Sequence, residues 1–375
     1  MKIRIIFILA AIVSGLQFTQ AQPAARPGIH PVWEPQKTWV FMVGLVEWKD
    51  KEEFESFPQE GRQDAVLLKL MKDRGVPDSQ ILYLKDSQAT TARIKSEFVK
   101  TLAKTRPGDW LFVYFEGHGY KDDDDAETFL ASYDASDDIE GWAVDSIPDA
   151  IERNFKGSHA MIALDNCYSG AMAEAVRMGK RRVSYAVMAS SLASQTSTGN
   201  WTFTEALVSG FRGAPYIDDD NDGKVTLFEM GENAREDMLF GEEQVATIVF
   251  TGRFDPQTVI ADSPAKALPR VGERVEAYSI DGWYKGYIAD ARGAKFKVHY
   301  FGYEETDDEW VTAKMIRQPK VVHYAVGQKV EVEWKKEWYP ATVVKVKGGV
   351  HYITYTGYGK EWDEWVSSKR IRRAK

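Results

Sequence analysis

The 375-residue sequence contains a single cysteine, Cys167, which excludes an intramolecular disulfide framework and a thiolate zinc site. No second long apolar stretch follows the one at the N-terminus, so no transmembrane helix is predicted after residue 21. Hydrophobic residues make up 44% and charged residues 28% of the chain, which excludes disordered and collagen-like classes. The length predicts two or three domains with a buried core. Because Cys167 has no second cysteine to pair with, its free thiol is the first feature that needs an explanation.

The N-terminus has the pattern of a signal peptide. Lys2 and Arg4 precede an apolar run over about residues 5–16, and the small Ala21 suits cleavage before Gln22. No cysteine follows this point, which excludes a bacterial-type lipid anchor there. We expect residues 1–21 to be removed and the mature protein to be secreted or periplasmic, in an oxidising compartment. The alternative is an uncleaved anchor.

Charge is distributed unevenly along the chain. Residues 22–270 contain 27 Lys and Arg against 41 Asp and Glu, whereas residues 271–375 contain 19 against 15. The acidic part argues against nucleic acid as a partner and is compatible with a cationic ligand, although acidic surfaces also serve solubility alone.

Apolar runs alternate with amphipathic segments over residues 38–263, after a linker rich in Pro and Ala over residues 22–37. The runs at 38–46, 110–116 and 160–165 are typical of strands buried on both faces. We expect further strands at 81–84, 128–132 and 183–189, and helices near 65–74, 91–104, 145–154, 171–178 and 202–211. This alternation predicts a mainly parallel sheet covered by helices on both sides, with functional residues beyond the carboxyl ends of its strands.

The C-terminal part is an internal duplication. Residues 271–317 align without gaps to residues 326–372, with about seventeen identities. Each copy contains short alternating strands separated by glycine turns, which is the pattern of a small all-β barrel. The segment 264–269, with a proline at each end, marks the boundary with the preceding domain.

Two strand ends carry the chemistry. The run at 110–116 leads into Gly117, His118 and Gly119, and the run at 160–165 leads into Asn166 and Cys167. In a parallel sheet both ends meet at one edge, where His118 can take the thiol proton of Cys167. The amides of Gly119 and Cys167 are candidate oxyanion donors, and the helix that starts near Gly170 is expected to lower the pKa of the thiol. The alternative is a structural cysteine and a packed histidine.

These motifs resemble those of the caspase-like (clan CD) cysteine peptidases, in particular metacaspases and bacterial caspase homologues. His118-Gly119 matches the family's His-Gly pair, and the six residues from Asp165 to Gly170 match its Asp-X-Cys-X-Ser-Gly signature. The resemblance covers roughly residues 38–213. It implies a three-layer α/β/α sandwich with a mainly parallel sheet, followed here by two small SH3-like barrels. It also implies a Cys-His endopeptidase, with Asp165 and Ser190 as substrate-binding residues.

Asp165, two residues before the nucleophile, is the candidate specificity residue. Metacaspases, which cut after Arg or Lys, carry Asp at this position, whereas caspases that cut after Asp carry a neutral amide there. A partly desolvated carboxylate favours a cationic P1 side chain. The resemblance therefore implies a peptide or protein substrate with a basic P1 residue. The alternative is that Asp165 caps the following helix.

Residues 218–229 follow the twelve-residue pattern of a calcium loop, with Gly223 at the sharp turn. The candidate ligands at positions 1, 3, 5, 7, 9 and 12 are Asp218, Asp220, Asp222, Lys224, Thr226 and Glu229. The alternative is a solvated acidic turn. The acidic run Asp122 to Asp125 is typical of a solvated loop, and calcium binding is the alternative there. No organic cofactor is implied.

A basic cluster follows the helix after Cys167. It contains Lys180, Arg181 and Arg182, at the place where caspases are cut into two subunits. With a basic P1 preference, self-cleavage at Arg181 or Arg182 is one interpretation. A basic end to the helix is the other.

The duplicated module resembles the chromo-barrel and Tudor-knot group of SH3-like barrels, in which aromatic side chains form cages for methylated lysine. The cage candidates are Trp283, Tyr300, Tyr303 and Trp310 in the first copy, and Trp338, Tyr355, Tyr358 and Trp365 in the second. Aromatic core packing is the alternative. The ligand of the barrels stays unknown, and a non-catalytic or weakly catalytic protein that binds a peptide or surface ligand through them is the alternative to an exported endopeptidase.

Overall fold

The computed structural model describes residues 30–122, 127–263, 268–318, 324–334, 337–347, 350–359, 362–367 and 370–374. The predicted signal peptide, residues 22–29 of the predicted linker, and the acidic run after Asp122 lie outside these residues. Pro31–Lys375 forms one compact unit. Within the described ranges, no helix combines the length and the apolar character that crossing a membrane requires.

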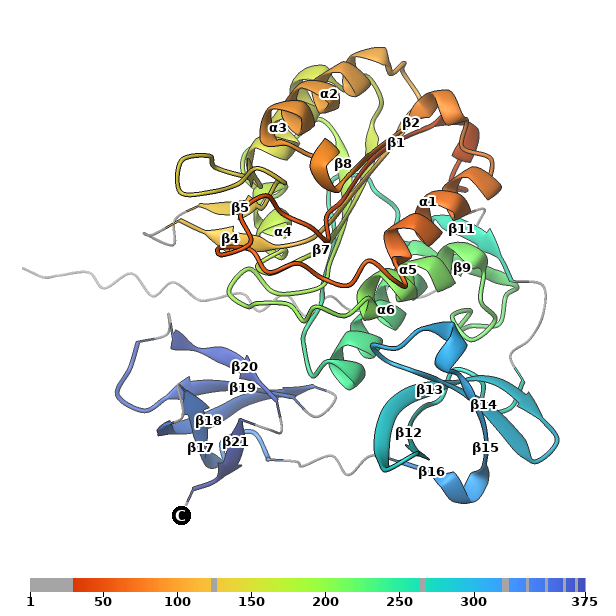
Figure 1. Cartoon of the computed structure of the whole chain (residues 1–375), viewed down its shortest axis with the longest axis vertical. Helices are drawn as coiled ribbons and strands as arrows, with labels where there is room; N and C mark the ends of the chain where they lie inside the picture. The colour runs from red at the N-terminus through yellow and green to blue at the C-terminus, as the bar shows by residue number, and fades with distance from the viewer. Residues whose placement is uncertain are drawn as a thin grey trace, which may run out of the picture. The chain divides into compact units, whose positions relative to one another are not determined.

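The α/β region is built on a six-stranded sheet with the order β10-β8-β7-β3-β1-β2 (Figure 1). Every neighbouring pair is parallel except β10 and β8. The strands are β1 (Thr38–Gly44), β2 (Ile81–Lys85), β3 (Trp110–Glu116), β7 (His159–Asp165), β8 (Ser184–Ala189) and β10 (Thr247–Phe250).

Helices cover both faces of this sheet (Figure 1). One core cluster joins Phe41 and Val43 of β1 to Phe98, and the other joins Val40 and Met42 to Phe211. The α-helices are α1 (Gln63–Asp73), α2 (Thr91–Lys104), α3 (Ser146–Asn154), α4 (Ala171–Ala175), α5 (Thr202–Arg212) and α6 (Leu227–Gly241). Alternate side chains of one buried strand thus enter opposite helix layers. The predicted three-layer α/β/α sandwich is confirmed.

Two small antiparallel sheets lie outside the main one. The first contains β4 (Gly119–Lys121), β5 (Thr128–Leu130) and β6 (Trp142–Ala143), and the second β9 (Lys224–Thr226) and β11 (Val259–Asp262). The strand expected at 128–132 is therefore β5, which pairs with β4 directly after His118 and not with the parallel sheet. Short 3-10 helices occupy Pro35–Lys37, Asp78–Gln80, Asp86–Gln88, Glu305–Asp307 and Ala313–Met315.

The duplicated part contains two five-stranded antiparallel sheets of the same topology. The first barrel has β12 (Arg274–Ser279), β13 (Gly282–Arg292), β14 (Lys295–Tyr300), β15 (Glu309–Thr312) and β16 (Ile316–Arg317). The second has β17 (Lys329–Trp334), β18 (Glu337–Lys347), β19 (Val350–Tyr355), β20 (Glu364–Val366) and β21 (Ile371–Arg373). Both long strands carry a register shift at the same position, at 288/290 and 343/345. Each sheet encloses a small core of its own, and the predicted all-β modules are confirmed.

Candidate active site

The two chemistry-bearing strands end side by side. β3 and β7 are parallel neighbours, and their last residues, Glu116 and Asp165, are direct register partners. The amide of Gly117 donates to the carbonyl of Asp165 at 3.4 Å, which carries the alignment one residue further. His118 and Cys167 follow at once. The structure therefore brings both predicted catalytic residues to one edge of the sheet.

His118 is oriented by a backbone carbonyl and by aromatic rings. Its Nε2 lies 2.8 Å from the carbonyl oxygen of Glu55, which can only accept, so Nε2 carries the proton and Nδ1 holds the free lone pair. The ring packs against Trp48 and Phe57, with centroids 4.5 and 4.6 Å away. Burial lowers the pKa of His118. A neutral imidazole with a free nitrogen is the form that a general base requires.

Cys167 holds a partly buried thiol. Burial raises its pKa, although the amides of Ser197, Gly119 and Cys167 itself oppose the shift. The Ser197 amide donates to Sγ at 3.2 Å. The expectation of a lowered thiol pKa is therefore wrong, because desolvation outweighs the amides and α4 is only five residues long. The resting pair is a neutral thiol and a neutral imidazole.

Gly119 lies against the backbone of the nucleophile. A Cβ at Gly119 would stand 2.2 Å from the carbonyl oxygen of Cys167 and 2.4 Å from Nδ2 of Asn166, so only glycine fits. Its amide and that of Cys167 both act on Sγ. Two backbone donors beside the sulfur are positioned where an oxyanion develops when the sulfur attacks a carbonyl.

Asp165 is buried behind the nucleophile. Its Oδ2 accepts from the Thr204 hydroxyl at 2.7 Å, and that hydroxyl also lies 2.7 Å from the Tyr114 hydroxyl. Burial raises the pKa of Asp165 to about 7, against the hydrogen bonds of Thr204 and Ser190. Asp165 does not cap α4, whose N-cap is Gly170 without a side-chain bond. Ser190, also buried, lies 3.0 Å from the Ser197 hydroxyl.

A cleft of about 280 Å³ opens beside this edge. It is lined by Phe57, Pro58, Glu60, Gly61, Gln63, Glu116, Gly199, Asn200, Trp201, Glu205, Gly302, Tyr303, Glu304 and Asp307. Glu116, the last residue of β3, is the residue of this set that lies nearest to His118 in sequence. We did not predict it from the sequence, because the last residue of an apolar run looks like a strand end and not like a site.

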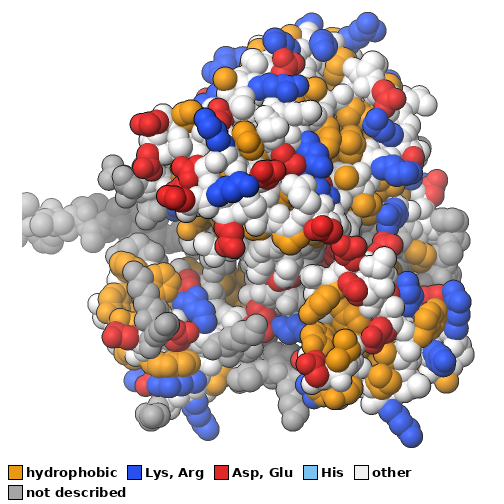
Figure 2. Space-filling view, in the orientation of Figure 1, with side chains coloured by type: hydrophobic (Ala, Val, Ile, Leu, Met, Phe, Trp, Pro, Cys, Tyr) orange, Lys and Arg blue, Asp and Glu red, His pale blue; other side chains and the backbone are white. Residues whose placement is uncertain are grey.

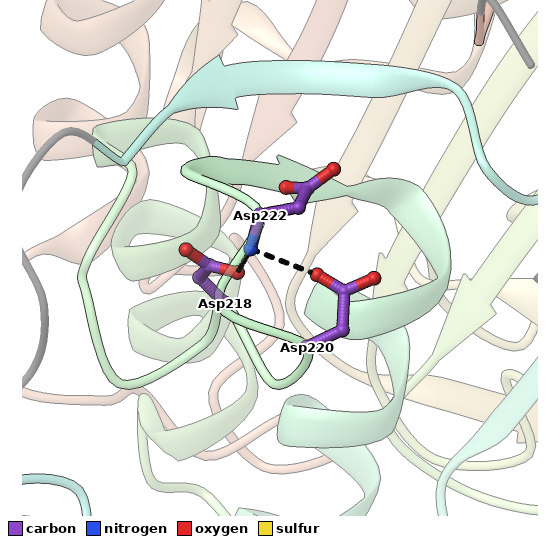
Figure 3. Close-up of side chains that lie close together, drawn as sticks. All are labelled: Asp218, Asp220 and Asp222. Atoms are coloured by element: carbon purple, nitrogen blue, oxygen red, sulfur yellow. Dashed lines mark hydrogen bonds between the residues drawn. The ribbon is translucent and has the colours of Figure 1, made fainter. Parts of the chain in front are cut away.

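The carboxylates of Asp218, Asp220 and Asp222 converge within 4.8 Å of one another (Figure 3). The amide of Asp222 donates to both other carboxylates at 3.1 Å, and Gly223 has a φ of +86°. Glu229 instead accepts from the amide and hydroxyl of Thr226 at the start of α6. Lys224 and Thr226 belong to β9. Three converging carboxylates and a tight turn fit a calcium ion, with Glu229 within the same loop.

Arg181 and Arg182 are held by the fold. Arg181 bonds to Asp149 at 2.5 Å, and Arg182 donates to the carbonyls of Phe155 and Gly157 at 2.6 and 2.8 Å. Cleavage after either residue would require these contacts to open, and self-processing stays a prediction.

An aromatic pocket of about 280 Å³ lies on the second barrel. It is lined by Trp334, Tyr339, Tyr355, Tyr358, Trp362, Asp363, Glu364 and, from the α/β region, Ser194. Two of the predicted cage residues, Tyr355 and Tyr358, line this pocket. The other two lie outside its lining: Trp338 stacks on Arg372 at 3.8 Å, and Trp365 packs against Tyr352. Trp334, Tyr339 and Trp362 line the pocket and were not predicted from the sequence.

The cage candidates of the first barrel lie in different surroundings. Trp283 and Trp310 stack on arginines of the same barrel, Arg317 at 4.0 Å and Arg292 at 4.8 Å. Tyr300 and Tyr303 contact Tyr284. Trp310 lines a pocket together with Tyr287, and Tyr303 lines the cleft described above. A ligand cage in this copy stays a prediction. Figure 2 shows hydrophobic side chains gathered at the surface of both barrels.

Comparisons with known proteins match both parts of the chain. Residues 272–321 match the Agenet domain, and residues 324–373 match Tudor-knot, described as the RNA binding activity-knot of a chromodomain. A search of curated proteins found no match. Caspase-1 from Spodoptera frugiperda is similar at 11% identity over 66% of this chain and 99% of that chain, with a TM-score of 0.44. A protein from Geobacter sulfurreducens is similar at 13% identity over 62% and 99%, with a TM-score of 0.42. The structure called Tbtudor is similar at 22% identity over 14% and 100%, with a TM-score of 0.14.

Proposed function

We propose that this chain, which joins a caspase-like α/β region to two Tudor-type barrels, is an exported cysteine endopeptidase that cleaves after Arg or Lys. The observation that carries the proposal is the meeting of His118 and Cys167 at the end of β3 and β7, with the Gly119 amide against the nucleophile.

The reaction uses the neutral resting pair. Nδ1 of His118 takes the thiol proton as Sγ of Cys167 attacks the substrate carbonyl carbon. The Gly119 and Cys167 amides hold the resulting oxyanion. The imidazolium then gives its proton to the leaving amine as the C–N bond breaks, and water hydrolyses the thioester to free the acid and restore the thiol. The Glu55 carbonyl keeps the ring oriented throughout.

The preference for a basic P1 residue is supported by the buried carboxyl group of Asp165, which lies at the end of β7. Asp165, with Ser190 beside it, places a carboxyl group behind the nucleophile, and its pKa of about 7 leaves it half protonated at neutral pH. A cationic side chain nearby would favour the charged form. Aspartate at P1 would add a like charge and is disfavoured.

A peptide panel that varies only P1 tests this function. Arg and Lys peptides should be cleaved well, norleucine peptides poorly, and Asp and Asn peptides hardly at all, with all cleavage lost in Cys167→Ala. A preference for Asp or Asn at P1 would refute the specificity. No cleavage of any peptide, with or without calcium, would favour the non-catalytic alternative.

The second barrel supports a binding function beside catalysis. Five aromatic side chains line its pocket, and Asp363 adds a carboxylate oxygen that has no hydrogen-bond partner among the described residues. Aromatic faces with an acid favour an organic cation such as a methylated lysine or arginine, and they disfavour the phosphates of RNA. Titration with trimethyl-lysine and unmodified peptides, followed by tryptophan fluorescence, tests this. Binding of an RNA oligonucleotide in place of both peptides would contradict it.

Calcium is proposed as the ion of the loop 218–229. Asp218, Asp220, Asp222, Thr226 and Glu229 would supply side-chain oxygens, and Lys224 its carbonyl. Millimolar calcium should raise the melting temperature of the wild-type chain, because a ligand that binds only the folded state stabilises it. The exposed-site variant Asp220→Asn should lose this shift. No shift in melting temperature or activity with calcium would retire the proposal.

Export is the remaining part of the proposal and has a direct test. N-terminal sequencing of protein recovered from the culture medium or periplasm should begin at Gln22. Recovery of an intact Met1 N-terminus from the cytoplasm only would contradict it.

A further inference from the structure

The cleft beside the catalytic edge is acidic and is built from two domains. Among its lining residues are five carboxylates and no lysine or arginine. Glu60, Glu116 and Glu205 come from the α/β region, whereas Glu304 and Asp307 come from the first barrel. A cleft with carboxylates on both walls attracts a cation and disfavours an anion.

The first barrel is fixed against the α/β region by basic residues of its own. Arg274 bonds to Asp237 and Glu236, each at 2.8 Å, and Lys285 bonds to Glu243 at 2.8 Å. His299 lies 3.4 Å from Glu205 of α5.

These docking residues are particular to the first copy. At the aligned positions the second barrel has Lys329, Pro340 and Thr354, so it has no counterpart of Lys285 or His299.

The turn 302–307 of the first barrel touches the cleft from two sides. A Cβ at Gly61 would stand 2.7 Å from Oε1 of Glu304, and a Cβ at Gly302 would stand 3.1 Å from Asn200. The amide of Glu304 donates to Oδ2 of Asp307 at 3.2 Å, which fixes the turn. The barrel thus supplies a defined wall to the cleft.

Glu116 is the buried carboxyl of this cleft. Its side chain belongs to a residue only 6% exposed, and its Oε2 has no hydrogen-bond partner within the described part of the chain. The nearby guanidinium of Arg62 is engaged by Asp64 at 2.7 Å and Asp86 at 2.8 Å. Burial, with the charges of Asp64 and Asp165, raises the pKa of Glu116 well above its ordinary value. An unpartnered buried carboxyl is costly unless a ligand supplies its counterion.

Two lining residues connect the cleft to the proposed catalytic pair. Phe57 lines it and packs against the ring of His118, with the ring centroids 4.6 Å apart. Gly199, also in the lining, stands two residues after Ser197, whose amide donates to Sγ of Cys167. The cleft is therefore a candidate site for a substrate side chain next to the bond that is cleaved.

We propose that the first barrel is part of the peptidase: the cleft binds the basic side chain of the substrate, with Glu116 as its buried specificity residue and Glu304 and Asp307 as a second acidic wall. This inference rests on the proposed function and names the residues that select its substrate. Trp201 and Tyr303 add aromatic faces that favour a guanidinium or ammonium group.

Binding is measured separately from cleavage, in the Cys167→Ala chain. Two acetyl-tetrapeptide amides that differ only in arginine or citrulline at the last position are titrated by calorimetry. The arginine peptide should bind at least about tenfold more tightly, since charged hydrogen bonds are lost with citrulline. Glu116→Gln and the double variant Glu304→Gln/Asp307→Asn should each reduce this ratio several-fold. Glu305→Gln, in the same turn but outside the cleft lining, is the matched control: it removes only an exposed ion pair with Arg212 and should leave the ratio unchanged.

Equal binding of the two peptides, or an unchanged ratio in both acidic-wall variants, would overturn the inference. The double variant alters a surface turn, so it keeps the test valid if Glu116→Gln does not fold. Selective arginine binding without cleavage by the Cys167-containing chain would support the cleft and refute the peptidase function. Cleavage after arginine with no effect of either variant would support the function and refute the cleft assignment.

Discussion

The two barrels share one fold and differ at several residues through which each contacts its surroundings. Their strand order, register shift and apolar cores correspond position by position. The first carries Ser279 and Asp307 where the second carries Trp334 and Trp362, two of the aromatic residues that line the pocket of the second barrel.

The two copies of the duplicated module therefore keep the same core, while their surface residues have different contacts. The first barrel uses Arg274, Lys285 and His299 to dock on the α/β region, and the second presents an aromatic pocket. The proposed catalytic residues, His118 and Cys167, belong to neither barrel. This division can be tested by variants that should affect one part and leave the others alone.

Cys167→Ala gives the largest expected effect. Cleavage should fall by at least about a thousandfold, because the nucleophile is removed. Affinity of the second barrel for a trimethyl-lysine peptide should stay unchanged. Loss of both activities together would show that catalysis and cage binding are not separate, and the fluorescence titration measures this directly.

The second-largest expected effect is the pH dependence that His299 gives to the free energy of unfolding. Burial alone would lower its pKa, but hydrogen bonds to Asp308 and Glu205 outweigh burial and raise the pKa to about 9. Because the folded pKa lies above the unfolded value near 6.5, the stabilisation is complete below pH 6.5 and is lost as pH rises towards 9. The free energy of unfolding should exceed that of His299→Gln by up to about 3 kcal/mol at pH 6, with the gap closing at pH 9. Denaturant titrations at both pH values measure it, and a constant gap would contradict the account.

Arg274→Ala should cost about 2 kcal/mol of unfolding free energy. It leaves Asp237 buried without its guanidinium partner, and burial already raises the pKa of Asp237 to about 6. Lys329→Ala, at the equivalent position of the second barrel, is the matched control and should change stability by less than about 0.5 kcal/mol. Equal losses of unfolding free energy in the two variants, measured by chemical denaturation, would contradict the assignment of a docking role to the first barrel alone.

Trp362→Ala gives the smallest effect. It should weaken trimethyl-lysine peptide binding about tenfold, from the loss of one cation–π face, and leave peptide cleavage unchanged. Trp310→Ala in the first barrel serves as control, because Trp310 is already covered by Arg292. Equal loss of binding in both variants would place the ligand elsewhere.

The neighbouring positions of His118 and Cys167 could be predicted from sequence because two buried strands end directly before these residues. The role proposed for Glu116 could not be predicted, because it depends on Arg62 being paired with Asp64 and Asp86. Only the folded structure shows those ion pairs. Likewise the carbonyl of Glu55 has no sequence signal.

The aromatic pocket of the second barrel could be predicted only in part. We chose aromatics that both copies share, and of these Tyr355 and Tyr358 line the pocket, whereas Trp338 stacks on Arg372. Trp334 and Trp362 also line the pocket. They differ between the copies, so the comparison of the two copies gave no signal for them.

Covalent labelling shows whether Cys167 is a nucleophile that reacts with basic peptides. The wild-type chain is treated with an acyloxymethyl ketone on a peptide that ends in arginine, and the adduct is located by mass spectrometry. We expect one adduct on Cys167, absent in His118→Ala and not formed by the matching aspartate reagent. Absence of an adduct, or equal labelling by the arginine and aspartate reagents, would refute the proposed peptidase function with its basic preference.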